Sequence, residues 1–292
     1  MQRVERVTAI KPGRAGFVGL RVVGSVLVRN EDLFVEQAVR NVVDFCDAVH
    51  IVDHLSDDGT WGIVQSLARE FDHIDARRSA NSGIAHELLA PYAGTSTWVL
   101  GVDGDELYDP FGLQELRADL GRGAHADVFR LKAHVLNCEE LDHSACTASG
   151  WLAPPSRPVT KLFNFAAVES WRESPDPLQS GKIDFRSGFD WETKRDLATT
   201  TTWSSDPLRL LHVCFLRRSS REELGDAWAR PNLDESREYD RTLFGRLRRV
   251  LRRPRRAPHL VELERRGTNW KREWYARGDR VVVDASRFLS SR

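Results

Sequence analysis

The first hundred residues alternate between short apolar runs and amphipathic stretches. Arg21 to Val28 reads RVVGSVLV, a β-branched run that predicts a buried strand. Asn30, followed by two acidic residues, has the composition of a helix start, so we expect a helix to begin immediately after it. The apolar positions that follow recur at three- and four-residue spacing and therefore share one helix face: Val35, Ala38, Val39, Val42, Val43 and Cys46.

The same alternation continues toward residue 100. A second strand is predicted at 48–52, and the Ser-Asp-Asp-Gly-Thr composition of 54–60 indicates a turn. A helix over 64–71 leads to a weaker strand at 73–77, and a short helix through Leu89 precedes a fourth strand. Repeated strand and helix pairs predict right-handed crossovers and a mostly parallel α/β sheet.

The fourth predicted strand stops at a group of acids. The run from Trp98 reads WVLGVDGDELYD, so that Asp103, Asp105 and Glu106 crowd onto the strand end. Crowded carboxylates repel one another, whereas Mg²⁺ or Mn²⁺ neutralises them and still accepts substrate phosphates. Ligands of open α/β sheets bind beyond the carboxyl ends of the strands. The sequence therefore predicts a metal site here, with a solvated acidic turn as the alternative.

Three segments, in order, resemble the nucleotide-sugar domain of family 2 glycosyltransferases. They are VLVRNEDLFVEQAVRN, HIVDHLSDDGTWGIV and WVLGVDGDELYDP, which carry an N-E segment, an S-x-D-G-T turn and a D-x-D metal motif. The resemblance covers roughly residues 20 to 110. It implies a GT-A (Rossmann-like) fold, a mostly parallel central sheet flanked by helices with a helical C-terminal segment. We expect a nucleotide-sugar half at 1–125, an acceptor half at 126–217 and an Arg-rich, mainly helical segment at 218–292.

The resemblance also implies roles for residues at the ends of the first two strands. Val28, Arg29 and Glu31 would border the nucleobase pocket, although a charge at a helix start explains Glu31 equally well. Asp53 would accept a hydrogen bond from a base N–H, because an ionised carboxylate is a hydrogen-bond acceptor only. Asp58 would be either a turn-forming residue or a ligand, and the Asp-Gly-Thr composition favours the turn.

Around the D-x-D motif, the resemblance places the metal and the diphosphate. Asp103 would face the ribose or the metal, and Asp105 would bind the metal and the diphosphate most directly. The cation, Mn²⁺ or Mg²⁺, would act as a Lewis acid on the departing nucleoside diphosphate. His212, within LLHVCFLR, is either a further ligand, which would favour Mn²⁺, or a core histidine.

The base that would deprotonate the acceptor is less clearly indicated. An inverting enzyme needs one carboxylate on the far face of the sugar, and a retaining enzyme needs none. Glu173 is our preferred candidate, because it lies between an aromatic residue and a proline-containing loop. The other acids in this part of the chain are Glu169, Asp176, Asp184 and Asp190. The segment from Asn137 to Cys146, between two predicted strands, is expected to form a loop over the acceptor site.

Composition is consistent with one soluble enzyme. The chain has 292 residues, 41% of them apolar, and its 43 basic and 43 acidic residues indicate no nucleic-acid partner. Four scattered cysteines are typical of a reducing compartment. With neither a signal-peptide pattern nor an apolar run of about 18 residues, we expect a cytoplasmic location. The chain also lacks the Q-x-x-R-W motif of processive synthases, which favours addition of a single sugar.

The C-terminal segment becomes strongly basic. Residues 241–256 contain eight arginines together with an apolar stripe at helical spacing. Such a helix either packs on the catalytic domain, which the short stripe favours, or makes a peripheral contact with the inner face of a membrane, which would suit a lipid-linked acceptor.

The sequence thus predicts metal-dependent transfer of one sugar from a nucleotide-diphosphate sugar to a hydroxyl acceptor: a glycan, a lipid-linked acceptor or a small molecule. The alternatives are a metal-dependent nucleotidyltransferase, for which a Gly-rich phosphate loop is missing after the first strand, and a non-catalytic carbohydrate-binding relative, which would have little reason to keep both Asp103 and Asp105. The donor sugar, the nucleobase, the acceptor, the stereochemical outcome and the oligomeric state are left open.

Overall fold

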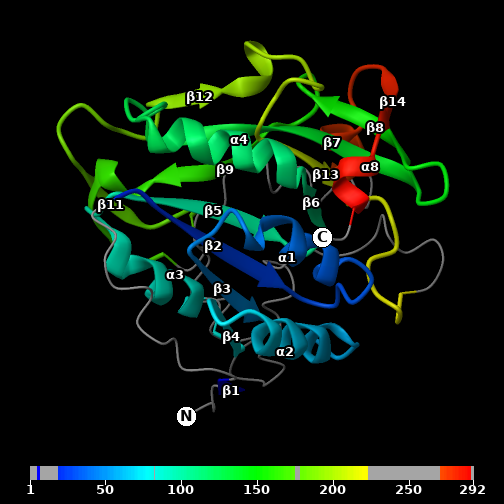
Figure 1. The fold of residues 1–292 in the computed structure, drawn as a ribbon, viewed down its shortest axis with the longest axis horizontal. Coiled ribbons are helices and arrows are strands. Elements are labelled where there is room, and N and C mark those ends of the chain that lie inside the picture. Colours follow the sequence, from blue (N-terminus) through cyan, green and yellow to red (C-terminus); the bar gives the residue numbers. More distant parts are fainter. Residues whose placement is uncertain (1–4, 7–18, 82, 175–177, 223–269, 291–292) are drawn as a thin grey trace, which may run out of the picture.

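The computed structural model describes residues 5–6, 19–81, 83–174, 178–222 and 270–290, which build one large sheet and a small one (Figure 1). The large sheet has 12 strands in the described residues. Its first part has the order β1-β4-β3-β2-β5, in which the last four strands run parallel and β1 is antiparallel to β4. The bounds are β1 (Glu5–Arg6), β2 (Arg21–Val28), β3 (Ala48–Asp53), β4 (Ile74–Arg78) and β5 (Thr97–Asp103). The four predicted strands of this region are confirmed.

The second part of the large sheet is organised around one long strand, β7 (Arg130–Asp142). Strand β9 is antiparallel to both β5 and the first part of β7, and β8 is antiparallel to the second part of β7. On the other side of β7, β12 and then β13 pair in parallel, and β6 follows β13. The bounds are β6 (Glu106–Tyr108), β8 (Thr147–Ala153), β9 (Val159–Asn164), β12 (Lys194–Asp196) and β13 (Arg209–His212).

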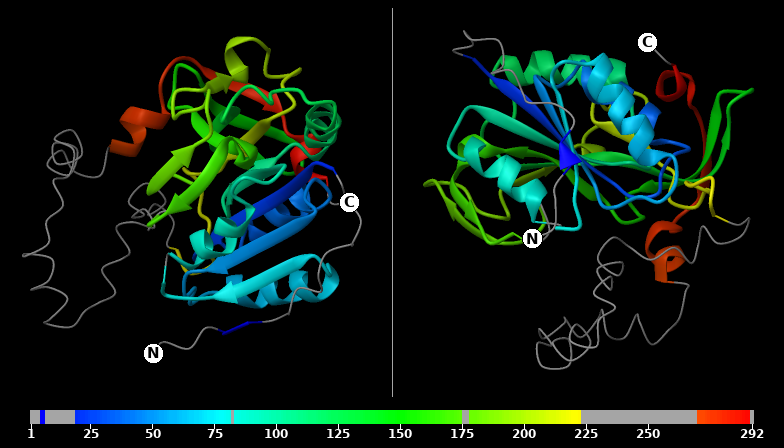
Figure 2. Two further views of the ribbon diagram at one scale, coloured as in Figure 1. Left: turned by 90° about the vertical axis from the view of Figure 1, so that its left-hand side faces the viewer. Right: turned by 90° about the horizontal axis from the view of Figure 1, so that it is seen from below.

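The expectation of a Rossmann-like, mostly parallel GT-A sheet flanked by helices is wrong. Within the large sheet, as far as it is described, six strand pairings are antiparallel and five are parallel. The sheet is also strongly curled (Figure 2). The physical reason is that the alternation of strand and helix ends with the helix α4 (Pro110–Gly121). Beyond it, β7 and β8 are joined by residues 143–146, a connection that suits a hairpin and is far too short for a parallel crossover.

Helices cover both faces of the parallel strands. Helices α1 (Val35–Val43) and α2 (Thr60–Glu70) share a core with Val26 and Ile51, whereas α3 (Ile84–Leu89) packs with Leu27 and Val52 on the opposite face. Helix α1 does not begin after Asn30, as we expected, but at Val35. Asn30 instead has φ 53°, and its N–H donates to Ser56 Oγ at 2.9 Å while its Oδ1 accepts from the N–H of Asp57 at 2.9 Å. Its side chain therefore holds the loop after β3 rather than the start of the helix.

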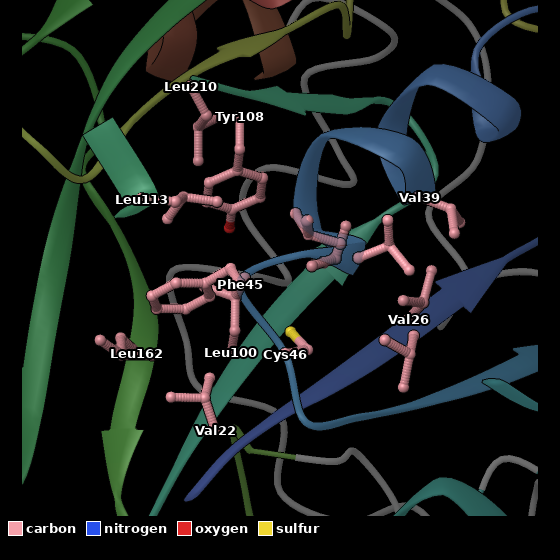
Figure 3. Close-up of a cluster of buried hydrophobic side chains, with 14 of the residues drawn as sticks. Val22, Val26, Val39, Phe45, Cys46, Leu100, Tyr108, Leu113, Leu162 and Leu210 are labelled. Atoms are coloured by element: carbon pink, nitrogen blue, oxygen red, sulfur yellow. The ribbon is translucent and has the colours of Figure 1, made fainter. Parts of the chain in front are cut away.

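The main core lies between α1, α4 and the sheet (Figure 3). Its side chains come from strands and helices that are far apart in the sequence, among them Val26, Val39, Leu100 and Leu113. Burying each such side chain contributes roughly 1.5–3 kcal/mol. Tyr108 is fully buried here, and its hydroxyl donates to the carbonyl oxygen of Gly101 at 2.8 Å. This core fixes β5 and β6 relative to each other, and with them the turn that carries Asp103 and Asp105.

The C-terminal residues do not form only helices. Strand β14 (Arg280–Asp284), between α7 (Trp270–Tyr275) and α8 (Ser286–Leu289), pairs antiparallel with β8. The segment after Asn137, which we expected to be a loop, is the β7–β8 hairpin itself. Both corrections have one cause, which is that each strand depends on a partner strand. Strand β14 pairs with β8, which is remote in the sequence, and the second part of β7 pairs with β8 across a turn. The predicted basic helix at 241–256 lies outside the described residues.

The remaining described elements are small. Strands β10 (Val168–Arg172) and β11 (Lys182–Phe185) form a separate hairpin. Three single turns of 3-10 helix are η1 (Ala90–Tyr92), η2 (Phe165–Ala167) and η3 (Leu197–Thr199). Across the described residues, no helix combines the length and apolar character that crossing a membrane requires.

Candidate functional site

The acidic residues predicted from the sequence lie at one edge of the sheet. The parallel register pairs Leu27 with Asp103 and Val28 with Asp53, so β2, β3 and β5 end side by side. The chain then turns at Gly104 and returns as β6, which pairs with β13 so that His212 lies opposite Glu106. We call Glu31, Asp103, Asp105 and Glu106 the acidic cluster. The pairing of β6 with β13 thus places His212 near carboxylates that lie more than one hundred positions earlier in the sequence.

Lys161 is the first of two cations that meet the acidic cluster. It comes from β9, is buried, and places its Nζ 3.0 Å from Asp103 Oδ2 and 2.7 Å from Glu106 Oε2. Burial raises the pKa of Glu106 to about 8; Lys161 opposes this shift, and the charges of Asp103 and Asp105 add to it. Burial opposes the charge on Lys161, yet the two carboxylates outweigh it and raise its pKa. A charged lysine therefore bridges two carboxyl groups.

Arg218 is the second cation, and it reaches the cluster from the segment after β13. Its Nη1 donates to Asp105 Oδ2 and lies 3.9 Å from Glu31 Oε1. Burial opposes the charge of the guanidinium, but Asp105 and Glu31 outweigh this effect and raise its pKa. The backbone carbonyl of Arg218 accepts from the N–H of Leu33 at 3.1 Å, which fastens this segment to the loop after β2.

His212 approaches the same carboxylate oxygen of Asp105 that accepts from Arg218. Its Nε2 lies 3.8 Å from Asp105 Oδ2, and its Nδ1 lies 2.9 Å from Asn137 Oδ1. Burial lowers the pKa of His212 to about 4, although Asp105 opposes the shift, so the imidazole is neutral at physiological pH. A neutral histidine beside a carboxylate is a donor set that suits Mn²⁺.

The predicted metal ligands do not all converge. Within the described ranges, no three His, Cys, Asp or Glu side chains come together in a way that would hold an ion by themselves. Asp103 is directed to Lys161, and its side chain is 42% exposed. Two bonds of about 2.0–2.1 Å to one ion can span the 3.8 Å between Asp105 and His212, but Arg218 donates to the same Asp105 Oδ2 and would have to make room for the ion. The pair forms half of a site, which substrate oxygens and water would have to complete.

Asp53 is buried at the end of β3, but protein groups already occupy its carboxylate. Its oxygens accept from Ser56 N at 3.3 and 3.2 Å, from Ser56 Oγ, and from Arg78 Nε at 3.1 Å. Burial raises its pKa, and the bonds from Ser56 and Arg78 counter that shift. The proposed bond from Asp53 to a nucleobase stays a prediction, and it would require the base to share the carboxylate with these partners.

Asp58 has two structural roles in the turn before α2. Its Oδ1 accepts from Thr60 N at 2.9 Å, and its Oδ2 accepts from Ser219 Oγ at 2.6 Å. Burial opposes its charge, but the bonds from Ser219 and Thr60 lower its pKa overall. Asp58 is therefore both a turn-forming residue and an anchor for the segment that carries Arg218.

The residues after β2 reach the acidic cluster through a glycine. Val28 is buried, and the N–H of Arg29 lies 3.4 Å from Glu31 Oε2. The carboxylate of Glu31 lies so close to Gly104 that a Cβ at that position would collide with Glu31 Oε2 and crowd Val28 Cγ1 at 3.0 Å. The glycine between the two aspartates thus permits the close approach of Glu31. The carboxylate of Glu31 therefore packs against this turn, in addition to any effect of its charge at a helix start.

The structure places Glu173 apart from these contacts. Its side chain is 68% exposed and pairs with Lys182 Nζ at 2.7 Å, which lowers its pKa. Glu169 is exposed on the same hairpin, and Asp184 pairs with Arg172 at 2.6 Å. Asp190 caps a surface turn, and Asp176 lies outside the described residues. The contacts described for Glu173, Asp184 and Asp190 are all to residues outside the acidic cluster, and the identity of the base stays a prediction.

Sequence reasoning missed Lys161, Arg218 and the role of Asn137. Lys161 had a signal, because a lysine at a core position of the apolar strand VTKLF is rare unless it is paired. Arg218 is one of many arginines in this chain, and Asn137 is an ordinary polar residue in a strand. The roles of Arg218 and Asn137 depend on the pairing of β13 with β7 and with β6, which no local sequence pattern indicates.

Two cavities lie away from the acidic cluster. One of about 290 Å³ lies between α1 and α2 and is lined by Arg40, Gly59, Ile63 and Glu70 among others. Another of about 500 Å³ is lined by Trp98, Gly121, Asn164 and Arg186 among others. The titratable groups of the first cavity, Glu36, Arg40 and Glu70, pair with one another near the surface, whereas Asp105, Glu106 and Lys161 are buried. We therefore place the candidate site at the acidic cluster.

Comparison with known proteins adds little. No family model matches the sequence, and no curated protein matches it either. Among solved structures, a mannose-6-phosphate isomerase from Helicobacter pylori is similar over 50% of this chain and 72% of its own, with 10% sequence identity and a TM-score of 0.31. A likeness this weak carries no argument about fold or activity.

Proposed function

We propose that this chain is a glycosyltransferase that moves a single sugar from a nucleotide-diphosphate sugar to a hydroxyl acceptor with the help of Mn²⁺ or Mg²⁺. The observation that carries the proposal is the meeting of the acidic cluster, Lys161, Arg218 and His212 at the ends of β2, β5 and β13. The proposal does not depend on a mostly parallel sheet. The three strands that bear the family-like motifs are parallel neighbours, and the antiparallel strands β9 and β6 join them to Lys161 and His212.

The charge balance of the site suits a diphosphate that arrives with a divalent cation. Four carboxyl groups face two cations, and with Glu106 protonated three carboxylates still face two cations. With Glu106 protonated, one divalent ion at Asp105 and His212 would change this net negative charge to a net positive one, which attracts a polyanion. Neither the acidic cluster without the metal ion nor the metal ion without the cluster would hold the diphosphate as well.

Each cation of the site would act on the leaving group. When bound, the metal would supply Lewis acidity toward the diphosphate oxygens. Lys161 forms an ion pair with Asp103, and Arg218 forms one with Asp105. Both would stabilise negative charge as the bond from the sugar to the diphosphate breaks. Glycosyl transfer would thus give the metal, Lys161 and Arg218 one shared role at the leaving group.

The test is a thermal-shift screen of UDP, dTDP, GDP and CDP, each with and without Mn²⁺. We expect one nucleotide to raise Tm only when Mn²⁺ is present, because selective binding at 100 times Kd stabilises the folded state by about 2.7 kcal/mol. Asp105→Asn should abolish that shift. The matched control is Asp119→Asn, which removes an exposed aspartate that pairs with Arg122 on α4.

Product analysis separates the remaining possibilities. Release of a nucleoside diphosphate from a sugar donor would support glycosyl transfer, whereas release of pyrophosphate from a nucleoside triphosphate would identify nucleotidyl transfer. Equal shifts in the Asp105→Asn variant and the unchanged chain, or no shift with any of the four nucleotides, would contradict the proposal. Binding of free sugars without nucleotides would favour the non-catalytic alternative.

A further inference from the structure

We propose that Asn137 is a positioning residue that fixes His212 in its Nδ1–H tautomer and leaves Nε2 unprotonated toward Asp105. The consequence for metal binding rests on the proposed function, but the tautomer itself does not. Asn137 lies on β7 and is fully buried. The parallel register of β7 and β13 pairs it directly with His212, so the two side chains are neighbours by strand pairing.

A short chain of hydrogen bonds sets the orientation of the Asn137 amide. Ser156 Oγ has one proton and donates it to the carbonyl oxygen of Leu152 at 2.9 Å. The hydroxyl oxygen can then only accept from Asn137 Nδ2, which lies 2.9 Å away. The amide oxygen Oδ1 must therefore point the other way, toward His212.

The amide oxygen then determines the tautomer of the imidazole. Asn137 Oδ1 accepts hydrogen bonds only, so His212 Nδ1, at 2.9 Å, must carry the proton. In a neutral ring Nε2 is then a bare acceptor, and it lies 3.8 Å from the carboxylate oxygen Asp105 Oδ2. Tyr275 packs edge-on against the ring, with centroids 5.4 Å apart and planes at 80°, which restrains its rotation.

Two acceptor atoms thus face each other at this distance, and Arg218, which donates from Nη1 to the same Asp105 Oδ2, supplies a cation beside them. The opposite tautomer would place an N–H toward Asp105, so Asn137 instead leaves the lone pair of Nε2 available for a cation on that side. A hydrogen-bond partner on the far nitrogen of a ligating histidine is a common feature of metal sites. Here a neutral amide takes that place, held by Ser156.

The direct test is ¹⁵N NMR of the His212 side chain in the metal-free protein at pH 7.5, in the unchanged chain and in three variants. We expect a protonated Nδ1 and an unprotonated Nε2 in the unchanged chain. Asn137→Leu, which has a similar shape and no acceptor, should lose this tautomer. Asn137→Asp keeps an acceptor oxygen and should retain it, while Ser156→Ala frees the amide to flip and should yield a mixture.

The second measurement is Mn²⁺ affinity in the presence of the stabilising nucleotide, read from the free-ion EPR signal. Asn137→Leu should weaken binding by about 10–100-fold, and Asn137→Asp should restore it. A proton on Nε2 in the unchanged chain, or an unaltered tautomer in Asn137→Leu, would overturn the proposal. A protonated Nδ1 without any Mn²⁺ binding would refute the proposed function, yet it would support the positioning role of Asn137.

Discussion

At the scale of single residues, the site is defined by charges that the fold has removed from water. Lys161 is almost fully buried, and its charge is acceptable there because Asp103 and Glu106 lie 3.0 and 2.7 Å from its Nζ. Asp103 and Asp105 were recognisable from the sequence, because two carboxylates at a strand end are an unusual local pattern. Their partners were not, since Lys161 and Arg218 come from segments roughly 60 and 110 positions further along the chain.

Glu106 should make stability depend on pH in a direction that is unusual for a carboxyl group. Its pKa is raised to about 8 in the folded protein from an ordinary value of 4.5, so the folded state binds the proton more tightly than the unfolded state. The stabilisation is fully present below pH 4.5 and is lost as pH rises through 8. Between pH 6 and 8 this group should lower the free energy of unfolding by about 2 kcal/mol.

Urea unfolding of Glu106→Gln at several pH values checks this expectation. The variant cannot titrate at this position, so its stability should fall less between pH 6 and 8 than that of the unchanged chain. Glu36→Gln is the matched control, because the side chain of Glu36 is 56% exposed. Parallel pH profiles for Glu106→Gln and the unchanged chain would show that Glu106 does not hold a proton in the folded state.

At the scale of elements, buried polar contacts join pieces that the sequence pattern treats as independent. Asp109 caps α4, since its Oδ1 accepts from Phe111 N at 3.0 Å. Its Oδ2 accepts from Arg209 Nε at 2.9 Å and from Arg209 Nη2 at 2.7 Å, which ties α4 to β13. The sequence predicted strands and helices well where apolar periodicity was strong, as in β2, β3 and α2. It could not indicate which of them would be neighbours.

Asp109→Ala should therefore destabilise the protein by about 3–5 kcal/mol, because it leaves the buried guanidinium of Arg209 without its carboxylate partner and with the Trp203 carbonyl oxygen as its one remaining acceptor among the described residues. The loss of the helix cap accounts for about 1 kcal/mol of such a change. Chemical denaturation measures the effect, with Asp119→Ala as the control on the same helix, where an exposed ion pair contributes at most about 1 kcal/mol. Similar losses for the two variants would contradict a structural role for the buried pair.

At the scale of the whole molecule, the C-terminal residues close onto the first part of the chain. Asn41 on α1 donates from Nδ2 to the carbonyl oxygens of Tyr108 and Phe288, at 2.8 and 2.9 Å. Phe288 is 1% exposed and stacks on Trp203, with ring centroids 5.8 Å apart. Residues 280–289 thus belong to the same folded unit as β8 and α1, although the sequence indicated only an Arg-rich helical segment.

Phe288→Ala tests this closure. It should lower the free energy of unfolding by about 3–5 kcal/mol, because a large buried ring is removed from a packed core. Val282→Ala on the neighbouring strand is the control, since that side chain is 71% exposed and should contribute under about 1 kcal/mol. A loss below 1 kcal/mol for Phe288→Ala, measured in urea, would mean that the end of the chain is not part of the cooperative unit.

The sequence by itself determined the parallel strands β2 to β5, the helices between them and the acids at Asp103 and Asp105. These features depend on periodicity and local composition, which act over a few residues. Tertiary structure alone decided the mixed, curled sheet, the pairing of β13 with β6 and β7, and the meeting of Lys161, Arg218, His212 and Asn137 with the acids. The physical reason is that strand pairing and charge compensation are satisfied between segments distant in sequence, where the chain carries no local pattern to reveal the partner.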